Sequence, residues 1–198
     1  IPFRDAFDSA RAGQNWVQIG HGGQTQRGTK TGDISVMAEG DISISGGKGY
    51  IDYAQIGHGG WDSDSRNSNG LTSMQNLQAD GDITVISNSG DVTLQGGNGD
   101  APNDIGQGSY AMVGHGGRSS SGSTIGNIVV RANDGSVFVH AGQNYQESFA
   151  LIGHGGRDSR AESWTGNITV YAMNNISLLS TESGYDSASN FAQIGHGG

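Results

Sequence analysis

The stretch that decides the fold is Tyr-Ala-Gln-Ile-Gly-His-Gly-Gly, residues 53–60, because close copies of it recur along the whole chain. Its last five positions follow the pattern Ile/Val-Gly-His-Gly-Gly, which occurs at 19–23, 56–60, 113–117, 152–156 and 194–198. An aromatic residue stands five positions before each histidine. The histidines are His21, His58, His115, His154 and His196, and the aromatic residues are Trp16, Tyr53, Tyr110, Phe149 and Phe191. Self-similarity of this regularity indicates a repeat protein.

A second motif lies between these copies and has the form Gly-Asp/Asn-Ile/Val-x-Val/Ile/Leu, with small departures. It occurs in pairs that begin at 32 and 40, 81 and 90, 126 and 135, and 166 and 174. Branched apolar residues alternate with Ser or Thr in most members, as in Ile34-Ser35-Val36. A period of two is typical of a strand with one buried face. Each repeat therefore predicts a strand, a tight corner, a second strand, a variable loop and a third strand.

One repeat has too few apolar side chains to form a core alone, whereas stacked repeats share a core and pair each strand with its copies. We therefore predict an all-β fold, a parallel β-helix (β-solenoid) of about three strands per coil with repeats of 37–57 residues. The prediction is a single domain over 1–198, with repeats that end at 23, 60, 117, 156 and 198 and an irregular lead-in over 1–12. The alternative is five independent hairpins on glycine-rich linkers, but an isolated hairpin is marginally stable in water.

The composition excludes several classes of protein. There are 36 glycines in 198 residues, which by count resembles a disordered chain, but many of these glycines mark corners and strand starts. The chain has 10 Lys and Arg against 19 Asp and Glu, so it lacks the basic surface of a nucleic-acid-binding protein. No apolar run approaches the ~18 residues of a membrane span, so we expect no membrane insertion. The absence of Cys excludes disulfides, thiolate metal sites and Cys nucleophiles.

The paired Gly-Asp-Ile-Ser/Thr-Val strands together with Tyr-Ala-Gln-Ile-Gly-His-Gly-Gly resemble the repeats of giant bacterial filamentous-haemagglutinin-like exoproteins, over about residues 24–198. Proteins of that family are attached to the cell surface or secreted by two-partner or autotransporter routes. The resemblance implies a β-solenoid and an extracellular or bacterial cell-surface location. It implies architecture and location more than a binding partner.

The five repeated histidines are candidate metal ligands. Strand alternation places Ala54, Ile56 and His58 on the inward face, and the varied position occupied by Gln55 on the outward face. Stacked copies would form a ladder at ~4.8 Å, in which two imidazoles could share Zn²⁺ or Cu²⁺. The alternative is a structural ladder in which each ring bonds a backbone carbonyl or the next ring and caps its glycine turn. Identity of all five favours the structural role, because a catalytic site needs one special position. His140 has no glycine neighbours and is expected to be an ordinary surface residue.

Two loops contain oxygen ligands in patterns that approach calcium sites. Residues 96–100 are one position short of the calcium nonapeptide, and residues 62–64 with Asn67 and Asn69 lack the spacing of an EF-hand loop. Solvated polar loops explain both patterns, so a structural calcium ion stays an alternative.

Carboxylates and aromatic residues raise the question of a carbohydrate site. Asp33, Asp41, Asp82 and Asp91 recur at strand starts, where capping of a turn accounts for them. The aromatic ladder formed by Trp16, Tyr53, Tyr110, Phe149 and Phe191 would bind sugars if exposed, or act as a stabilising stack if covered. No Ser–His–Asp set stands out from the repeats, so we expect no enzymatic activity.

These observations predict an extracellular structural or adhesive module, a shaft or filament subunit. The expected partners are further copies stacked head to tail, further repeats of a longer chain, or a glycan of a host or cell surface. The alternative is a β-helix that binds or degrades carbohydrate.

Overall fold

The computed structural model describes residues 15–63, 78–98, 108–143, 147–160, 163–180 and 190–197. Within these ranges the chain forms seventeen β-strands that belong to four parallel sheets. Sheet I contains β1 (Trp16–Ile19), β5 (Tyr53–Ile56), β9 (Ala111–Val113), β13 (Ala150–Ile152) and β17 (Ala192–Ile194). Sheet II contains β2 (Lys30–Thr31), β6 (Gln78–Asp80), β10 (Ser123–Ile125) and β14 (Trp164–Thr165). Sheet III contains β3 (Ile34–Ala38), β7 (Ile83–Ser87), β11 (Ile128–Ala132) and β15 (Ile168–Ala172). Sheet IV contains β4 (Ile42–Ser45), β8 (Val92–Gln95), β12 (Val137–His140) and β16 (Ile176–Leu179).

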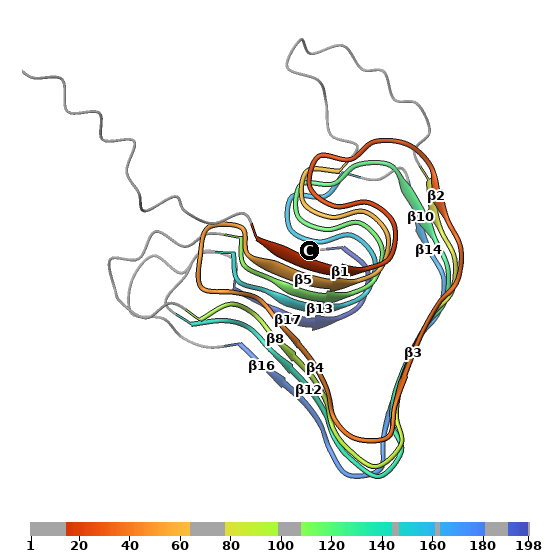
Figure 1. The fold of residues 1–198 in the computed structure, drawn as a ribbon, viewed down its shortest axis with the longest axis vertical. Helices are drawn as coiled ribbons and strands as arrows, with labels where there is room; N and C mark the ends of the chain where they lie inside the picture. The colour runs from red at the N-terminus through yellow and green to blue at the C-terminus, as the bar shows by residue number, and fades with distance from the viewer. Residues whose placement is uncertain are drawn as a thin grey trace, which may run out of the picture.

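Every strand pairs in parallel with its copy in the next repeat, and the register follows the sequence motifs. In sheet III, for example, Ile34 faces Ile83, Ile83 faces Ile128, and Ile128 faces Ile168. Successive coils lie one above another when the molecule is viewed along the stack (Figure 1). The prediction of an all-β parallel solenoid is confirmed. In the part of the chain that the structure describes, there is no helix long and apolar enough to cross a membrane.

Each coil has one strand more than the three expected. The additional strands form sheet II and are only two or three residues long. They follow the glycine turn, after the chain has folded back over sheet I and passed to the other side of the coil (Figure 1). Segments as short as Lys30–Thr31 carry no recognisable alternation, so their pairing with Ala79 and Asp80 depends on the stacking of the neighbouring strands.

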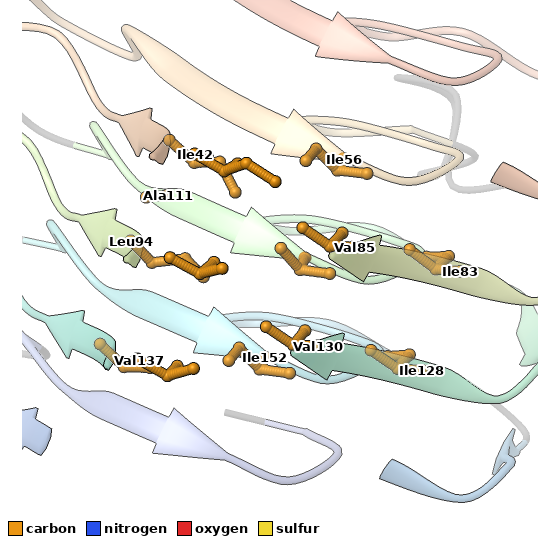
Figure 2. Close-up of a cluster of buried hydrophobic side chains, with 14 of the residues drawn as sticks. Ile42, Ile56, Ile83, Val85, Leu94, Ala111, Ile128, Val130, Val137 and Ile152 are labelled. Atoms are coloured by element: carbon orange, nitrogen blue, oxygen red, sulfur yellow. The ribbon is translucent and has the colours of Figure 1, made fainter. Parts of the chain in front are cut away.

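The main core lies between sheets I, III and IV and consists of the inward residues that the alternation predicts (Figure 2). Strand β7 shows the pattern clearly, since Ile83 and Val85 are fully buried while Thr84 and Ile86 between and beside them are partly exposed. Full burial of each such side chain contributes roughly 1.5–3 kcal/mol. Because each coil supplies the same inward positions, the core is a column of stacked aliphatic residues.

A second hydrophobic cluster covers the opposite face of sheet I, where the sequence predicted exposed residues. Gln55, Met112 and Leu151 occupy the varied position that was expected to point to solvent, yet all three are buried. The expectation was wrong because the chain after each glycine turn folds back over this face. The cluster consists of Ile51, Tyr53, Tyr110, Met112, Phe149 and Leu151, with Tyr50, Trp61 and Phe191 packed against it.

Candidate functional site: the histidine ladder

The Gly-His-Gly-Gly turns place the histidines at the end of each strand of sheet I. Gly57 and Gly59 have φ angles of 153° and 105°, in the region that favours glycine. A Cβ atom on Gly57 would also collide with the carbonyl oxygen of Gly114 in the next coil. The glycines are therefore required both by backbone conformation and by the close approach of stacked turns.

The five imidazole rings form a continuous stack along the solenoid. From His21 through His196 the centroids of successive rings are 5.0, 4.8, 4.9 and 4.9 Å apart, and neighbouring planes differ by 12° or less. His58, His115 and His154 are almost completely buried, with exposed fractions of 1, 0 and 0%. The expected ladder at the spacing of parallel strands is thus present.

Both nitrogens of the inner rings make hydrogen bonds that fix the tautomer. The backbone N–H of His58 donates to Nδ1 of His115 over 3.0 Å. The same contact joins His21 to His58, His115 to His154, and His154 to His196. Because a backbone N–H can only donate, Nδ1 is unprotonated and Nε2 carries the proton.

The Nε2–H groups donate to glycine carbonyls at the start of sheet III in the same repeat. His58 bonds the oxygen of Gly32, His115 that of Gly81 and His154 that of Gly126, each over 2.8 Å. His196 makes the equivalent bond to Gly166 over 3.1 Å. These glycines open the Gly-Asp/Asn-Ile motif, so each histidine joins the two repeated motifs across the coil.

Burial keeps the inner rings neutral. It lowers the pKa of His115 to about 3 and that of His154 to about 4, and the hydrogen bonds to Gly81 and Gly126 oppose these shifts only in part. Burial also lowers the pKa of His58, followed by repulsion from His21 and Lys30. Protonation would additionally place a hydrogen on Nδ1 against the backbone N–H that it accepts. The three inner rings, His58, His115 and His154, are therefore neutral at physiological pH.

The predicted Zn²⁺ or Cu²⁺ site would need a lone pair on an imidazole nitrogen. In His58, His115 and His154, the Nδ1 lone pair accepts a backbone N–H and Nε2 carries a proton. Coordination through either nitrogen would break one of these bonds. Among the described residues, no group of three or more His, Asp or Glu lies close enough to hold a metal ion. The geometry supports the structural reading of the histidines, and metal binding stays a prediction for elemental analysis.

The predicted aromatic ladder forms a second stack, on the other face of sheet I. Successive ring centroids are 6.2, 4.8, 4.6 and 4.9 Å apart from Trp16 through Phe191. Tyr53, Tyr110 and Phe149 are 1, 0 and 0% exposed, so a sugar ring cannot reach their faces. Burial raises the pKa of Tyr53 to about 12. A Cβ on Gly60 or Gly117 would crowd the hydroxyl of Tyr53 or Tyr110, so the last glycine of these two turns makes room for the ladder.

The repeated aspartates act between coils, at the corners that precede sheets III and IV. Asp33 Oδ1 accepts the backbone N–H of Asp82 over 2.9 Å, and Asp82 Oδ1 accepts that of Asn127 over 2.7 Å. At the next corner Asp41 and Asp91 make the same contacts with the following coil. These carboxylates brace corners, which agrees with the capping role expected for them.

His140 is half-buried on sheet IV and lies within 3.4 Å of the hydroxyl of Ser177.

The calcium predictions fall largely outside the described residues. Asp100, Asp64, Asn67 and Asn69 lie outside the described residues. The described Asn98 accepts the backbone N–H of Gln143 over 2.8 Å. Structural calcium therefore stays a prediction.

Two features were not foreseen. Glu147 is 5% exposed, has a φ of 63°, and bridges Arg118 at 2.5 Å and Arg157 in the following repeat. The arginines directly follow two of the glycine turns, which is the one sequence clue to this cluster. Gln55 donates its buried amide to the carbonyls of Gly114 and Gly116 over 2.9 and 3.1 Å.

The comparisons with known proteins add no relative. No family model matches the chain, and no curated protein or solved structure does so.

Proposed function

We propose that this chain is an extracellular structural or adhesive solenoid module, a shaft or filament subunit of a bacterial surface or secreted protein. One observation carries the proposal: the repeated polar residues that could perform chemistry are used to bond one coil to the next. The histidine rings bond the preceding coil through Nδ1 and close their own coil through Nε2. The aspartates bond the backbone of the following coil. A chain whose repeated imidazole and carboxylate groups form hydrogen bonds within the stack is suited to mechanical support rather than to catalysis.

The physical basis of support is the direction of these bonds. Strand pairs, imidazole contacts and carboxylate contacts all join neighbouring coils, so they act in parallel along the axis of the stack. The number of residues between sheets IV and I, and between the glycine turns and sheet II, differs from repeat to repeat, while the strands keep the same register. Such a shaft would carry adhesive surfaces on its loops or on neighbouring domains, with surface glycans as the expected targets.

Location provides the first test. Antibodies raised against the 198-residue chain should label intact, unpermeabilised cells of the source organism, or its culture medium. Immunogold electron microscopy of the same sample should place the label on elongated particles. Label that appears only after lysis, or only on compact particles, would contradict the proposal.

A carbohydrate-binding solenoid is the second candidate, and an exposed pair on sheet III favours it. Tyr171 is 42% exposed, and the guanidinium of Arg131 in the preceding coil lies 5.2 Å from its ring centroid. An aromatic face beside a hydrogen-bond donor suits a sugar ring. Binding on a glycan array that is lost in Tyr171→Ala would support this function. Turnover of an acidic polysaccharide that disappears in Asp82→Asn would support a degrading enzyme instead.

A further inference from the structure

The two ends of the stack do not match strand for strand. Among the described residues, sheet I has five strands and sheets II, III and IV have four each. At one end the outermost strands are β1, β2, β3 and β4. At the other end, which we call the C-terminal end of the stack, they are β14, β15, β16 and β17. Because sheet I has one strand more than each of the other sheets, a second copy cannot continue all four sheets while its own β1 stays in place.

The C-terminal end of the stack exposes groups whose counterparts are covered in the inner coils. Ile176 and Leu178 are each 47% exposed, although they are in register with the fully buried Val137 and Val139. In sheet III, Asn167 donates its backbone N–H to Asn127 Oδ1, which leaves its own side-chain oxygen at the place where a further coil would bond. Among the described residues, no further coil covers these strands.

The opposite end carries the matching set. Nδ1 of His21 has no partner among the described residues, whereas Nδ1 of the four later histidines each accepts a backbone N–H. In β1, Trp16, Val17 and Ile19 are 46, 68 and 50% exposed. Like β17, β1 pairs on one side only, with β5, but its side chains are more exposed than those of β17, so it is the less supported of the two outermost strands of sheet I.

A second copy can extend all four sheets at the C-terminal end only by giving up its own β1. If β2, β3 and β4 of the second copy pair with β14, β15 and β16 of the first, sheets II, III and IV continue without a break. The level in sheet I that the β1 of that copy would occupy is then already filled by β17 of the first. The two segments have the same motif, Trp-Val-Gln-Ile-Gly-His-Gly at 16–22 and Phe-Ala-Gln-Ile-Gly-His-Gly at 191–197. Strand β17 can therefore replace β1 beside β5.

Stacking without exchange leaves a defect. If β1 of the second copy paired with β17, its strands β2, β3 and β4 would lie two strand spacings from β14, β15 and β16, about 9.6 Å instead of about 4.8 Å. Ile176 and Leu178 would then face an empty layer, which forfeits their dispersion contacts. Exchange replaces one pairing of sheet I by an equivalent one and gains three further strand pairs.

We propose that copies of this chain join head to tail by strand exchange, with β17 of one copy taking the place of β1 in the next. The proposal rests on the structural function proposed above and adds the partner and the register of the junction. It places Phe191 of one copy against Tyr53 of the next, and the backbone N–H of His196 against Nδ1 of His58.

Engineered disulfides test this register, because the chain has no cysteine of its own. Ser35 and Thr169 are exposed and hold equivalent positions in β3 and β15, in register through Thr84 and Val129. At the exchanged junction their Cα atoms in neighbouring copies would be about 4.8 Å apart, within the range that a disulfide spans. Without exchange they would be about 9.6 Å apart, which is too far. A second pair, Ser43→Cys with Ser177→Cys, makes the same test in sheet IV.

The experiment is mild oxidation of each variant of the full chain, followed by non-reducing electrophoresis. We expect the monomer band of S35C/T169C and of S43C/S177C to shift to a ladder of dimers and higher multimers. The single-cysteine variants should remain monomeric. The matched variant V17C/A192C reports unexchanged stacking and should also remain monomeric. Native secondary structure by circular dichroism is required of every variant.

Three outcomes overturn the proposal. Cross-linking of V17C/A192C without S35C/T169C would show stacking without exchange. Dimers of a single-cysteine variant would show a head-to-head or tail-to-tail contact. A monomer in all variants would show that copies do not join in this way. None of these outcomes alters the result of labelling on intact cells, so failure of the junction and failure of the proposed function are distinguishable.

Discussion

Acidification should destabilise this protein through the inner histidines, and the sign follows from their pKa values. In the unfolded chain a histidine has a pKa of ~6.5. In the folded protein burial lowers the pKa of His115 to about 3 and that of His154 to about 4. Between these values the unfolded chain binds more protons than the folded one, so stability falls as pH falls. The contribution is fully present above pH ~6.5 and is lost progressively toward the folded pKa values.

The magnitude at pH 4.5 follows from the same values. There the unfolded histidines are almost fully protonated, while His115 and most of His154 remain neutral in the folded state. Because pH 4.5 lies ~2 units below the unfolded pKa, each of the two histidines lowers the free energy of unfolding by about 2.7 kcal/mol relative to pH 7. The pair together lowers it by about 5 kcal/mol. The whole stability of a typical domain is ~5–15 kcal/mol. Mild acid should therefore remove a large part of the free energy of unfolding.

Urea denaturation at pH 7 and pH 4.5, followed by far-ultraviolet circular dichroism, measures this loss. The matched control is H115N/H154N, because asparagine offers an oxygen to the backbone N–H but does not titrate. The wild-type protein should lose about 5 kcal/mol more than the variant between the two pH values. Carboxylates titrate in both proteins and cancel in the comparison. Equal losses in the two proteins, or imidazole NMR titrations with pKa values near ~6.5, would refute the reasoning.

Three further predictions concern the turns, the buried carboxylate and metal content. Gly114→Ala should destabilise the protein by more than about 3 kcal/mol, because its Cβ would strike the carbonyl of the next coil at a φ of 155°. The control is Gly40→Ala, which has open space around its Cβ and should change the stability by less than about 0.5 kcal/mol. Thermal denaturation measures both changes. Glu147→Gln removes the carboxylate shared by Arg118 and Arg157 and should cost about 3 kcal/mol in urea denaturation; an unchanged midpoint would exclude a stabilising role. Elemental analysis of protein purified without chelator should find no stoichiometric Zn or Cu, and retained metal that raises the melting temperature would contradict the hydrogen-bonded ladder.

The main core was predictable because it depends on local alternation. Residues such as Ile83 and Val85 are separated by one polar residue, and strand geometry alone sends both to the same side. Stacking then follows from the repeat, since identical strands pair most simply in register. The ladders were predictable for the same reason, because each residue bonds its own copy.

What the sequence did not predict depends on contacts between different parts of a coil. The second cluster exists because the chain folds back over sheet I. The residue types at the varied position, Gln55, Met112 and Leu151, do not indicate that this face of the sheet is buried. A position that accepts both an amide and aliphatic groups reads as exposed, yet Gln55 is buried with its amide bonded to two glycine carbonyls. Glu147 meets Arg118 only through the packing of two loops, which no local spacing encodes.

The repeat itself indicates where to look for function specific to this chain. A residue that bonds its own copy must recur in every coil, so recurrence of a histidine or an aspartate is evidence of stacking, and a site for one ligand must break the repeat. The described residues that do so on the outer surface include Arg131 and Tyr171, which replace Met37 and Ile86 at the same register position of sheet III. Their aromatic and cationic groups lie together and are exposed. Ligand binding by this solenoid is therefore better sought at such irregular positions than along the ladders that hold it together.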